Sequence, residues 1–252
     1  MIRGETLGVV AGSGLDLLPL LDVIDEERDF REVLGLTTAG VSGHSGRFVF
    51  GRSEGVSVVL QCGRLHLYEG LGYAHATVPV AALSAFGVNQ VVFTNAAGGL
   101  LPDMQPGDLM AADAIRAWPY SKWDAHARPI TPDFVPADCE WRGAYHWVHG
   151  PCYETRAEIA ALRSLGSAAV GMSIAPEMAR AQALGMRVAA ISCITNNCCT
   201  PQVLTHDHVL RTAAAASTRL CAVVRGLMRS TDLNTESQRP QKVPSDVFKF
   251  HI

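Results

Sequence analysis

The stretch that decides the fold runs from Gly150 to Asn196 and reads GPCYETRAEIAALRSLGSAAVGMSIAPEMARAQALGMRVAAISCITN. Near its start, Thr155-x-x-Glu158 has the spacing of a capping box, in which each side chain bonds the other residue's backbone N–H. Apolar residues recur at helical spacing behind this box, and Gly166 is a typical C-terminal stop. The pattern therefore predicts a helix that begins just after Glu154.

Three further segments continue an alternating pattern. Residues 168–173 are a short apolar run typical of a buried strand, and residues 176–185 begin with a proline suited to the first turn of a helix. Residues 187–194 are a second apolar run that predicts another strand. Strands that alternate with helices at this spacing predict an α/β fold with a twisted, mostly parallel central sheet flanked by helices.

Chemically versatile residues stand near the predicted strand ends. Met172 and Ser173 end one strand, Asn196 lies at the end of another, and Glu154 precedes the first helix. Open α/β sheets bind ligands at the carboxyl ends of their strands, so these residues predict a binding site. Glu154 has a simpler alternative role, which is to cap the helix that follows it.

The composition limits the possible classes of protein. The chain of 252 residues is 48% apolar and 18% charged, which is typical of a globular protein. A formal net charge of -3 gives no electrostatic argument for a nucleic-acid partner, and no apolar run is long enough to span a membrane. Seven cysteines without a signal-peptide pattern favour reduced thiols in the cytoplasm. We expect one domain over residues 1–233 and a polar, loosely ordered tail over residues 234–252.

The N-terminal region contains a weaker signal for anion binding. An apolar strand, residues 7–11, leads into Gly12-Ser13-Gly14, where backbone N–H groups and a hydroxyl can hold an anion. A plain turn remains an alternative, whereas a dinucleotide site needs a third glycine where Leu17 stands. His44 lies in a glycine-rich stretch, residues 36–46, that predicts a loop.

Arg64 and His66 form the next candidate. They are two residues apart, so in an extended segment both side chains project to the same side. A guanidinium fork and an imidazole side by side suit a phosphate oxyanion. The alternative is an ion pair between Arg64 and Glu69 in a solvated loop.

The rest of the chain supplies the predicted framework. We expect a hairpin over residues 47–61, a helix over 76–86 and a buried strand over 90–94, followed by small residues that permit either close ligand approach or tight packing. Residues 109–114 predict a strand and residues 118–147 an irregular excursion. After Asn196, His206 precedes a long helix over residues 209–228.

Seven motifs occur in one order and span most of residues 7–210. They are Gly12-Ser13-Gly14-Leu15, Gly43-His44-Ser45-Gly46, Gly63-Arg64-x-His66-x-Tyr68-Glu69-Gly70, Thr94-Asn95-Ala96-Ala97-Gly98-Gly99, Gly150-Pro151-x-Tyr153-Glu154-Thr155, Val170-Gly171-Met172-Ser173 with Pro176-Glu177, and Ile194-Thr195-Asn196. Each is modest alone, but together they resemble the trimeric class of the purine nucleoside and methylthioadenosine phosphorylase family. The resemblance implies a nucleoside phosphorylase-like fold.

The resemblance also implies the reaction. Members of this family are glycosyltransferases of purine salvage that convert a purine nucleoside and phosphate reversibly into the free base and ribose 1-phosphate. Phosphate is a co-substrate, and neither a cofactor nor a metal is implied; the expected assembly is a homotrimer. Residues carried over to the phosphate site are Ser13, His44, Arg64, His66, Ala96 and Ser173. Those carried over to the nucleoside site are Tyr68, Tyr145, Tyr153, Glu154, Met172, Asn196 and His206, of which Asn196, Glu154 and His206 are also expected to be catalytic, together with His66.

The residues carried over to the base site imply a substrate preference. The Asn196 amide offers both a donor and an acceptor, and an ionised Glu154 accepts from the N1–H that hypoxanthine and guanine carry. We therefore expect cleavage of inosine and guanosine. The alternatives are a methylthio-nucleoside phosphorylase with a different 5′-group preference, a nucleosidase that uses water and leaves Arg64 and His66 unexplained, and a non-catalytic purine or phosphate binder.

One region departs from the family pattern. The segment between Gly107 and Tyr145 is shorter than in the family, and Asp113-Ala114-Ile115-Arg116 replaces the usual Asp-His-Ile-Asn. The missing stretch normally carries an aromatic residue into the neighbouring subunit's sugar pocket. We therefore expect a weakened or altered trimer.

Overall fold

The computed structural model describes residues 6–35, 45–118, 123, 128–201 and 204–229. His44, most of the predicted loop over residues 36–46 and the predicted tail over residues 234–252 lie outside these ranges. No helix in the described part of the chain is both long and apolar enough to cross a membrane.

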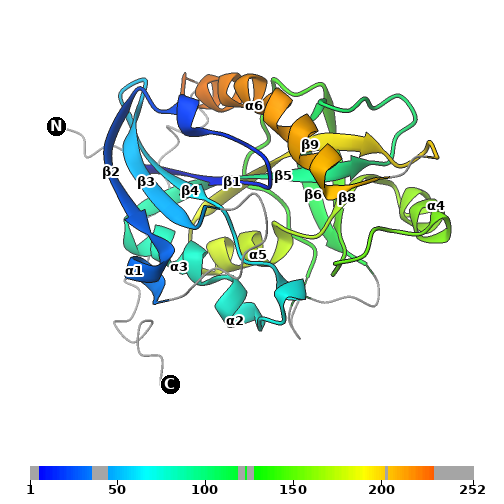
Figure 1. The fold of residues 1–252 in the computed structure, drawn as a ribbon, viewed down its shortest axis with the longest axis horizontal. Helices are drawn as coiled ribbons and strands as arrows, with labels where there is room; N and C mark the ends of the chain where they lie inside the picture. The colour runs from blue at the N-terminus through cyan, green and yellow to red at the C-terminus, as the bar shows by residue number, and fades with distance from the viewer. Residues whose placement is uncertain (1–5, 36–44, 119–122, 124–127, 202–203, 230–252) are drawn as a thin grey trace.

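One mixed sheet of nine strands organises the described residues (Figure 1). Its order is β2-β3-β4-β1-β5-β8-β7-β6-β9, and β9 also pairs with β5, so β5, β8, β7, β6 and β9 close into a ring. The strands are β1 (Thr6–Ala11), β2 (Val23–Asp29), β3 (Arg47–Ser53), β4 (Val56–Cys62), β5 (Val88–Gly99), β6 (Leu109–Ala117), β7 (Trp141–Trp147), β8 (Ser167–Gly171) and β9 (Arg187–Asn197).

The pairing confirms the predicted parallel centre. Strands β4, β1, β5 and β9 pair in parallel, as do β6 with β7 and β7 with β8. The predicted hairpin is confirmed as antiparallel β3 and β4, and β2, β8 and β6 add antiparallel pairings. Parallel strands that start from the same side place the loops after β1, β4, β5 and β9 at one edge of the sheet.

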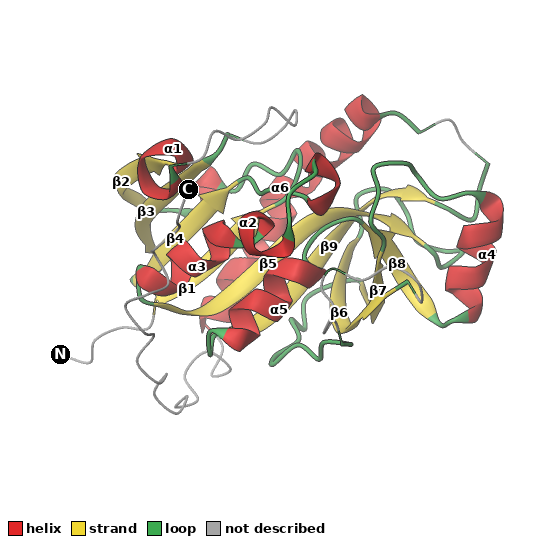
Figure 2. Cartoon of the chain, turned by 90° about the horizontal axis from the view of Figure 1, so that it is seen from below, coloured by secondary structure: helices red, strands yellow, loops and turns green. Residues whose placement is uncertain are grey.

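Helices cover both faces of the sheet (Figure 2). On one face, α3 and α5 bury Leu83 and Met178 against Phe93. On the other, α6 buries Leu220 and Val224. The helices are α1 (Phe30–Leu34), α2 (Tyr73–Ala76), α3 (Val78–Ala85), α4 (Arg156–Ser164), α5 (Ala175–Ala183) and α6 (His206–Arg229), with single 3₁₀ turns at Leu18–Leu20 and Leu67–Glu69.

The helix that the capping box predicts is confirmed as α4. Thr155 accepts from the Glu158 N–H at 3.3 Å, and the Glu158 carboxylate accepts from the Thr155 N–H at 2.7 Å. The helix gives way at Gly166, whose φ of +74° suits a residue without a Cβ. Glu154 is therefore not the cap, and its carboxylate is left for another role.

Of three further predictions, one was wrong. The helix expected over residues 76–86 is confirmed as α3, which begins two residues later, and the separate short helix α2 precedes it. Pro79 suits the first turn of α3, because its missing N–H needs no partner there. Residues 118–147 include a strand, β7, whose last four residues are buried and which therefore lacks an alternating pattern. Asn196 lies at the carboxyl end of β9, as predicted.

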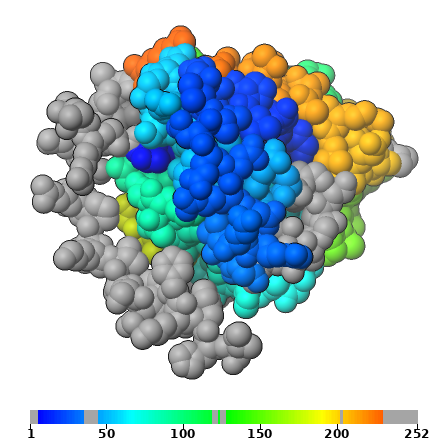
Figure 3. Space-filling view, turned by 60° about the vertical axis from the view of Figure 1, so that its left-hand side comes forward, coloured from blue at the N-terminus to red at the C-terminus, as the bar shows by residue number. Residues whose placement is uncertain are grey.

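Strand β2 is an exposed edge of the sheet. All seven of its residues are exposed, and Figure 3 shows β2 and α1 at the surface of this end of the molecule. The edge carries charges of both signs, because Asp25, Glu26 and Glu27 form ion pairs with Arg52, Arg28 and Arg47. Charged edge strands resist pairing with other chains, so the charge protects this edge from aggregation.

Candidate active site

The ends of the parallel strands surround one large cavity. Its volume is about 890 Å³, which is within the range of small-molecule sites. Segments that follow β1, β4 and β8, together with β5, β9 and the starts of α4 and α6, contribute to its wall. Of the expected site residues, those that line it are Ser13, Arg64, His66, Tyr68, Ala96, Tyr153, Glu154, Met172, Ser173, Asn196 and His206.

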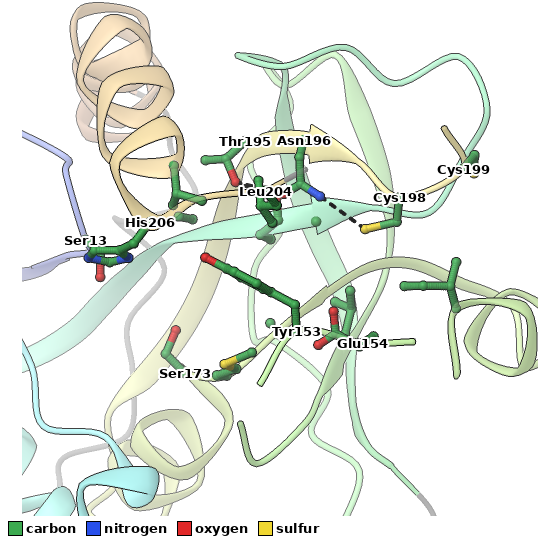
Figure 4. Close-up of a pocket in the computed structure, with 18 of the residues that line it drawn as sticks. Ser13, Tyr153, Glu154, Ser173, Thr195, Asn196, Cys198, Cys199, Leu204 and His206 are labelled. Carbon is green, nitrogen blue, oxygen red and sulfur yellow. Dashed lines mark hydrogen bonds between the residues drawn. The ribbon is translucent and has the colours of Figure 1, made fainter. Parts of the chain in front are cut away.

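Two glycines let the loop after β1 approach its neighbours closely. A Cβ on Gly12 would lie 2.6 Å from the Asn95 Cα on β5. A Cβ on Gly14, whose φ is +74°, would lie 2.7 Å from the Leu210 carbonyl oxygen on α6. The loop between them therefore brings Ser13 to the cavity wall, where Figure 4 draws it at the same end as His206.

Arg64 is buried, and its partner is Glu177 rather than Glu69. Its side chain is 1% exposed, with Nε 3.2 Å from the Glu177 carboxylate on α5. Nη1 donates to Ser173 Oγ at 3.1 Å. Nη2 is buried and has no hydrogen-bond partner among the described residues. A buried guanidinium with an unbonded arm beside a cavity is suited to an anion, because an unbonded buried donor is costly.

A strained turn sets the position of Ser173. The Ala175 N–H donates to the Ser173 carbonyl at 2.7 Å, and Ile174 has φ +57° and ψ −42°, which are the features of a classic γ-turn. The Ile174 N–H also donates to the Glu177 carboxylate at 3.1 Å. One carboxylate therefore holds both Arg64 and the turn that carries Ser173.

Glu69 instead positions His66. Its carboxylate accepts from the His66 backbone N–H at 2.6 Å and lies 3.3 Å from the ring Nδ1. The His66 ring also stacks on Tyr68, with centroids 4.6 Å apart and planes inclined by 16°. Both rings are thus fixed against the cavity wall.

Glu154 lies at the opposite end of the cavity from Ser13 (Figure 4). Its Oε1 is buried and has no hydrogen-bond partner among the described residues. Burial raises the pKa of this carboxyl above its ordinary value, and the nearby Glu158 raises it further. A buried carboxylate oxygen that faces a cavity is suited to an N–H donor of a ligand.

The Asn196 amide faces the same cavity and is held at both ends. Its Oδ1 accepts from the Thr195 hydroxyl at 3.2 Å, and its Nδ2 donates to Cys198 Sγ at 3.3 Å. A Cβ on Gly98 of β5 would lie 2.6 Å from this sulfur, so a larger residue would displace it. The amide therefore presents a fixed donor and a fixed acceptor.

Tyr145 is placed differently from the other expected residues. It is fully buried and does not line the cavity. Its hydroxyl donates to the Ser173 carbonyl at 3.2 Å and accepts from the Ser173 N–H at 3.4 Å. This arrangement does not provide the expected contact between Tyr145 and the ribose, because the Tyr145 hydroxyl bonds the Ser173 backbone outside the cavity.

The remaining lining residues combine apolar and polar surfaces. Tyr68, Tyr153 and Met172 contribute rings and a thioether, and burial raises the pKa of Tyr68 to about 12, so its hydroxyl stays protonated at neutral pH. His206 stands at the start of α6. Such a wall, apolar with convergent polar groups, suits a flat heterocycle joined to a polyol.

Sequence reasoning gave no role to Glu177, Thr195 or Cys198. The sequence did contain a signal for the contact of Glu177 with the Ile174 backbone. A glutamate at the third position of a helix commonly accepts a hydrogen bond from the N–H of the residue before the helix. Neither Thr195 nor Cys198 carries such a signal. Their contacts with Asn196 depend on the local path of the chain at the end of β9.

Known proteins resemble this chain over most of its length. Residues 6–229 match the family model described as Phosphorylase superfamily. The chain is 34% identical to purine nucleoside phosphorylase 1 of Geobacillus stearothermophilus, over 90% of this chain and 92% of that one. It is 33% identical to purine nucleoside phosphorylase of Rattus norvegicus, over 89% and 88% of the two chains.

Solved structures show the same fold. The Schistosoma mansoni purine nucleoside phosphorylase in complex with adenosine superposes with a TM-score of 0.71 at 26% identity, covering 90% of this chain and 91% of that one. A Schistosoma purine nucleoside phosphorylase in complex with hypoxanthine superposes with a TM-score of 0.73 at 25% identity, with the same coverage.

Proposed function

Since the chain belongs to the purine nucleoside phosphorylases of the phosphorylase superfamily, we propose that it acts on 6-oxopurine nucleosides and prefers inosine and guanosine to adenosine. The observation that carries this proposal is that two polar groups line one cavity. Glu154 Oε1 has no hydrogen-bond partner among the described residues, and the Asn196 amide is held at both ends. Both groups suit the polar edge of hypoxanthine or guanine.

We assign phosphate to the end of the cavity that contains Arg64, Ser173, His66 and Ser13. The buried guanidinium supplies charge, and its unbonded Nη2 supplies a donor. The Ala96 backbone lines the same wall. His44, which lies outside the described residues, belongs to this proposed set by resemblance.

The proposed chemistry uses the charge that develops as the glycosidic bond breaks. Phosphate oxygen forms a bond to C1′ of the sugar, the bond from C1′ to N9 breaks, and its electron pair moves onto the purine. The phosphate anion stabilises the positive charge on the sugar. Asn196 Oδ1 accepts from a protonated N7 and its amide N–H donates to O6, contacts that strengthen as the base becomes electron-rich.

Selectivity follows from the same contacts. An ionised Glu154 accepts from the N1–H of a 6-oxopurine, whereas N1 of adenine is itself an acceptor. Two acceptors facing each other in a desolvated pocket cost several kcal/mol, equivalent to about a hundredfold or more in kcat/KM. The Schistosoma structures with adenosine and with hypoxanthine concern binding in those proteins, while this proposal concerns turnover.

The test is a substrate panel with the purified enzyme. Base release from inosine, guanosine and adenosine is measured with and without phosphate. We expect strict phosphate dependence and kcat/KM for inosine about a hundredfold or more above that for adenosine. Comparable values for inosine and adenosine would refute the proposed selectivity, and release without phosphate would indicate a nucleosidase.

A further inference from the structure

Tyr145 contacts the proposed phosphate end of the cavity from outside it. Its side chain is fully buried and does not line the cavity, whereas Ser173 and Ala96 do. The Tyr145 hydroxyl donates to the Ser173 carbonyl at 3.2 Å and accepts from the Ser173 N–H at 3.4 Å. One hydroxyl therefore holds both polar backbone groups of a residue whose own Oγ accepts from Arg64.

Strand pairing in the described part of the chain stops short of Ser173. The antiparallel pairing of β8 with β5 reaches only to Val170, and β8 itself ends at Gly171. The Tyr145 hydroxyl lies directly beside this strand end, since a Cβ on Gly171 would be 2.6 Å from Tyr145 Oη and 3.3 Å from Asn95 Nδ2. The hydroxyl therefore takes the place of ladder hydrogen bonds at this point.

The direction of the hydrogen bonds around this hydroxyl is set by groups that can only accept. Asn95 Nδ2 lies 3.0 Å from the Ala96 carbonyl, which has no proton to give, so the nitrogen end of the amide must face it. The same Nδ2 donates its second N–H to Tyr145 Oη at 3.5 Å. The Tyr145 proton is then directed to the Ser173 carbonyl, which is a second group that can only accept.

Strand β9 anchors the other end of the Asn95 side chain. Asn95 Oδ1 accepts from the Ser192 hydroxyl at 2.9 Å, and both residues are buried. Burial also raises the pKa of Tyr145 above its ordinary value, so its hydroxyl keeps its proton at neutral pH. A continuous chain of hydrogen bonds thus runs from β9 through β5 to Ser173, and it includes the Ala96 carbonyl.

We propose that Tyr145 is a positioning residue for phosphate. Its hydroxyl, directed by Asn95, holds Ser173 in place relative to Ala96, so that both face the same anion. Groups that converge on one ligand must be placed to within about 0.5 Å, and neighbouring hydrogen bonds supply that precision. The inference rests on the proposed phosphate site and assigns Tyr145 to that site in place of the sugar contact implied by the family resemblance.

The experiment compares Tyr145→Phe with Thr77→Val. Phenylalanine removes the hydroxyl and keeps the buried ring. Thr77→Val is the control for the loss of a buried hydroxyl elsewhere, because Thr77 is 1% exposed, donates to the Tyr73 carbonyl at 2.8 Å and does not line the cavity. The readouts are the phosphate KM at saturating inosine, the inosine KM at saturating phosphate, hypoxanthine affinity without phosphate, and the melting temperature.

We expect Tyr145→Phe to raise the phosphate KM about three- to tenfold, the size expected for one ordinary hydrogen bond. The kcat should stay within about twofold, since a contact weakened equally in the ground state and the transition state changes KM alone. The inosine KM and the hypoxanthine affinity should also stay within about twofold, because other contacts hold the base end. Thr77→Val should lower the melting temperature and leave the phosphate KM unchanged.

The outcomes separate this inference from the proposed function. Base release without phosphate in the wild type refutes the proposed function and the inference with it. Strict phosphate dependence with an unchanged phosphate KM in Tyr145→Phe overturns the inference alone, as does an equal rise in the inosine KM or a similar rise in Thr77→Val. A rise in the inosine KM alone would restore the sugar contact.

A second variant tests the same chain of hydrogen bonds from its other end. If Tyr145→Phe does not fold, Ser192→Ala removes the anchor of Asn95 and leaves Tyr145 intact. A phosphate KM raised about twofold or more, with unchanged hypoxanthine affinity, then supports the inference. An unchanged phosphate KM in Ser192→Ala contradicts it.

Discussion

At the scale of single residues, Arg64 connects the fold to the chemistry. Its guanidinium contacts the Glu177 carboxylate and Ser173 Oγ, and Nη2 has no hydrogen-bond partner among the described residues. Glu177 in turn holds the backbone of the γ-turn at Ile174. A change at either member of the ion pair should therefore affect stability as well as phosphate use.

The first prediction concerns Arg64→Ala. We expect the phosphate KM to rise and kcat/KM to fall. The fall should correspond to a loss of about 2–3 kcal/mol of transition-state stabilisation, because a charge-assisted contact is lost. Stability should also fall, since Glu177 is 4% exposed and would be left unpaired. Initial rates across a phosphate series, measured well below the melting temperature, provide the test.

Two further variants separate the causes. Arg142→Ala removes an exposed arginine that pairs with Asp113, and the phosphate kinetics of this variant should match the wild type. Arg64→Lys keeps the charge but lacks the planar fork, so phosphate use should remain impaired. Wild-type phosphate kinetics in Arg64→Ala would remove Arg64 from the proposed site.

The second prediction concerns the pH dependence of base binding. Burial raises the pKa of Glu154 above 4.5, and N1–H recognition needs the ionised form. Hypoxanthine affinity should therefore be constant above the raised pKa and fall about tenfold per pH unit below it. Calorimetry without phosphate measures this, because phosphate titration then plays no part.

The same shift has a stability consequence of opposite sign. A carboxyl whose folded-state pKa is raised contributes stability below pH 4.5, and that contribution is lost as the pH rises through the raised pKa.

The control for the binding prediction is Glu154→Gln, which should bind hypoxanthine more weakly and with little dependence on acid pH. An equal pH dependence of binding in the wild type and in Glu154→Gln would assign the titration to another group.

At the scale of elements, α4 fixes where Glu154 lies. The capping box of Thr155 and Glu158 closes the first turn directly after Glu154. The third prediction is that Thr155→Ala lowers the free energy of unfolding by about 1 kcal/mol and raises the KM for inosine. Thr155→Ser should retain both values, since its hydroxyl can still cap. Chemical denaturation and inosine kinetics provide the measurements, and unchanged values in Thr155→Ala would contradict this role.

The framework was predictable where the signal is local. The capping box, the glycine stops and the apolar runs of the central strands depend on neighbouring residues, and α4, β1, β8 and β9 follow them closely. The strand β7 was not predicted, because its last four residues are all buried and Tyr145, His146 and Trp147 therefore show no alternating pattern.

The site was predictable as a set of residues but not as a set of contacts. Glu69 is five residues from Arg64, yet Glu177 is its ion-pair partner because α5 packs beneath the loop after β4. The family resemblance implies a sugar contact for Tyr145, yet its hydroxyl donates to the Ser173 carbonyl behind the cavity wall. Such partners are set by the crossing of distant elements, which no local pattern records.

At the scale of the whole molecule, the region after β6 packs onto its own chain. Trp123 is 5% exposed and makes an edge contact with Trp147, with ring centroids 5.7 Å apart. Ile130 bonds back to Ile115, and Asp133 accepts from the Val188 N–H at 2.9 Å. The described part of this region is thus used within one subunit.

The fourth prediction concerns assembly. We propose that the enzyme forms a weaker or altered trimer than its trimeric relatives, because the shortened region between Gly107 and Tyr145 does not supply the family's crossing segment. Sedimentation velocity over a concentration series should reveal dissociation. A trimer of constant mass at every concentration would show that the missing segment is dispensable for assembly.

The sheet brings the two ends of the cavity together, although they come from distant parts of the chain. Arg64 enters from the loop after β4, while Asn196 lies on β9, the strand that closes the ring against β5. Phosphate and base are therefore assigned to opposite ends of one wall. We propose that the polar groups at the base end determine which purine is released.

The most direct measurement compares inosine with adenosine in Asn196→Asp and in the wild type. A carboxylate at position 196 accepts from a 6-amino group and opposes a 6-oxo group, so we predict that the inosine-to-adenosine ratio of kcat/KM falls about a hundredfold or more. A ratio that stays at a high wild-type value in Asn196→Asp would show that Asn196 does not determine which purine is released.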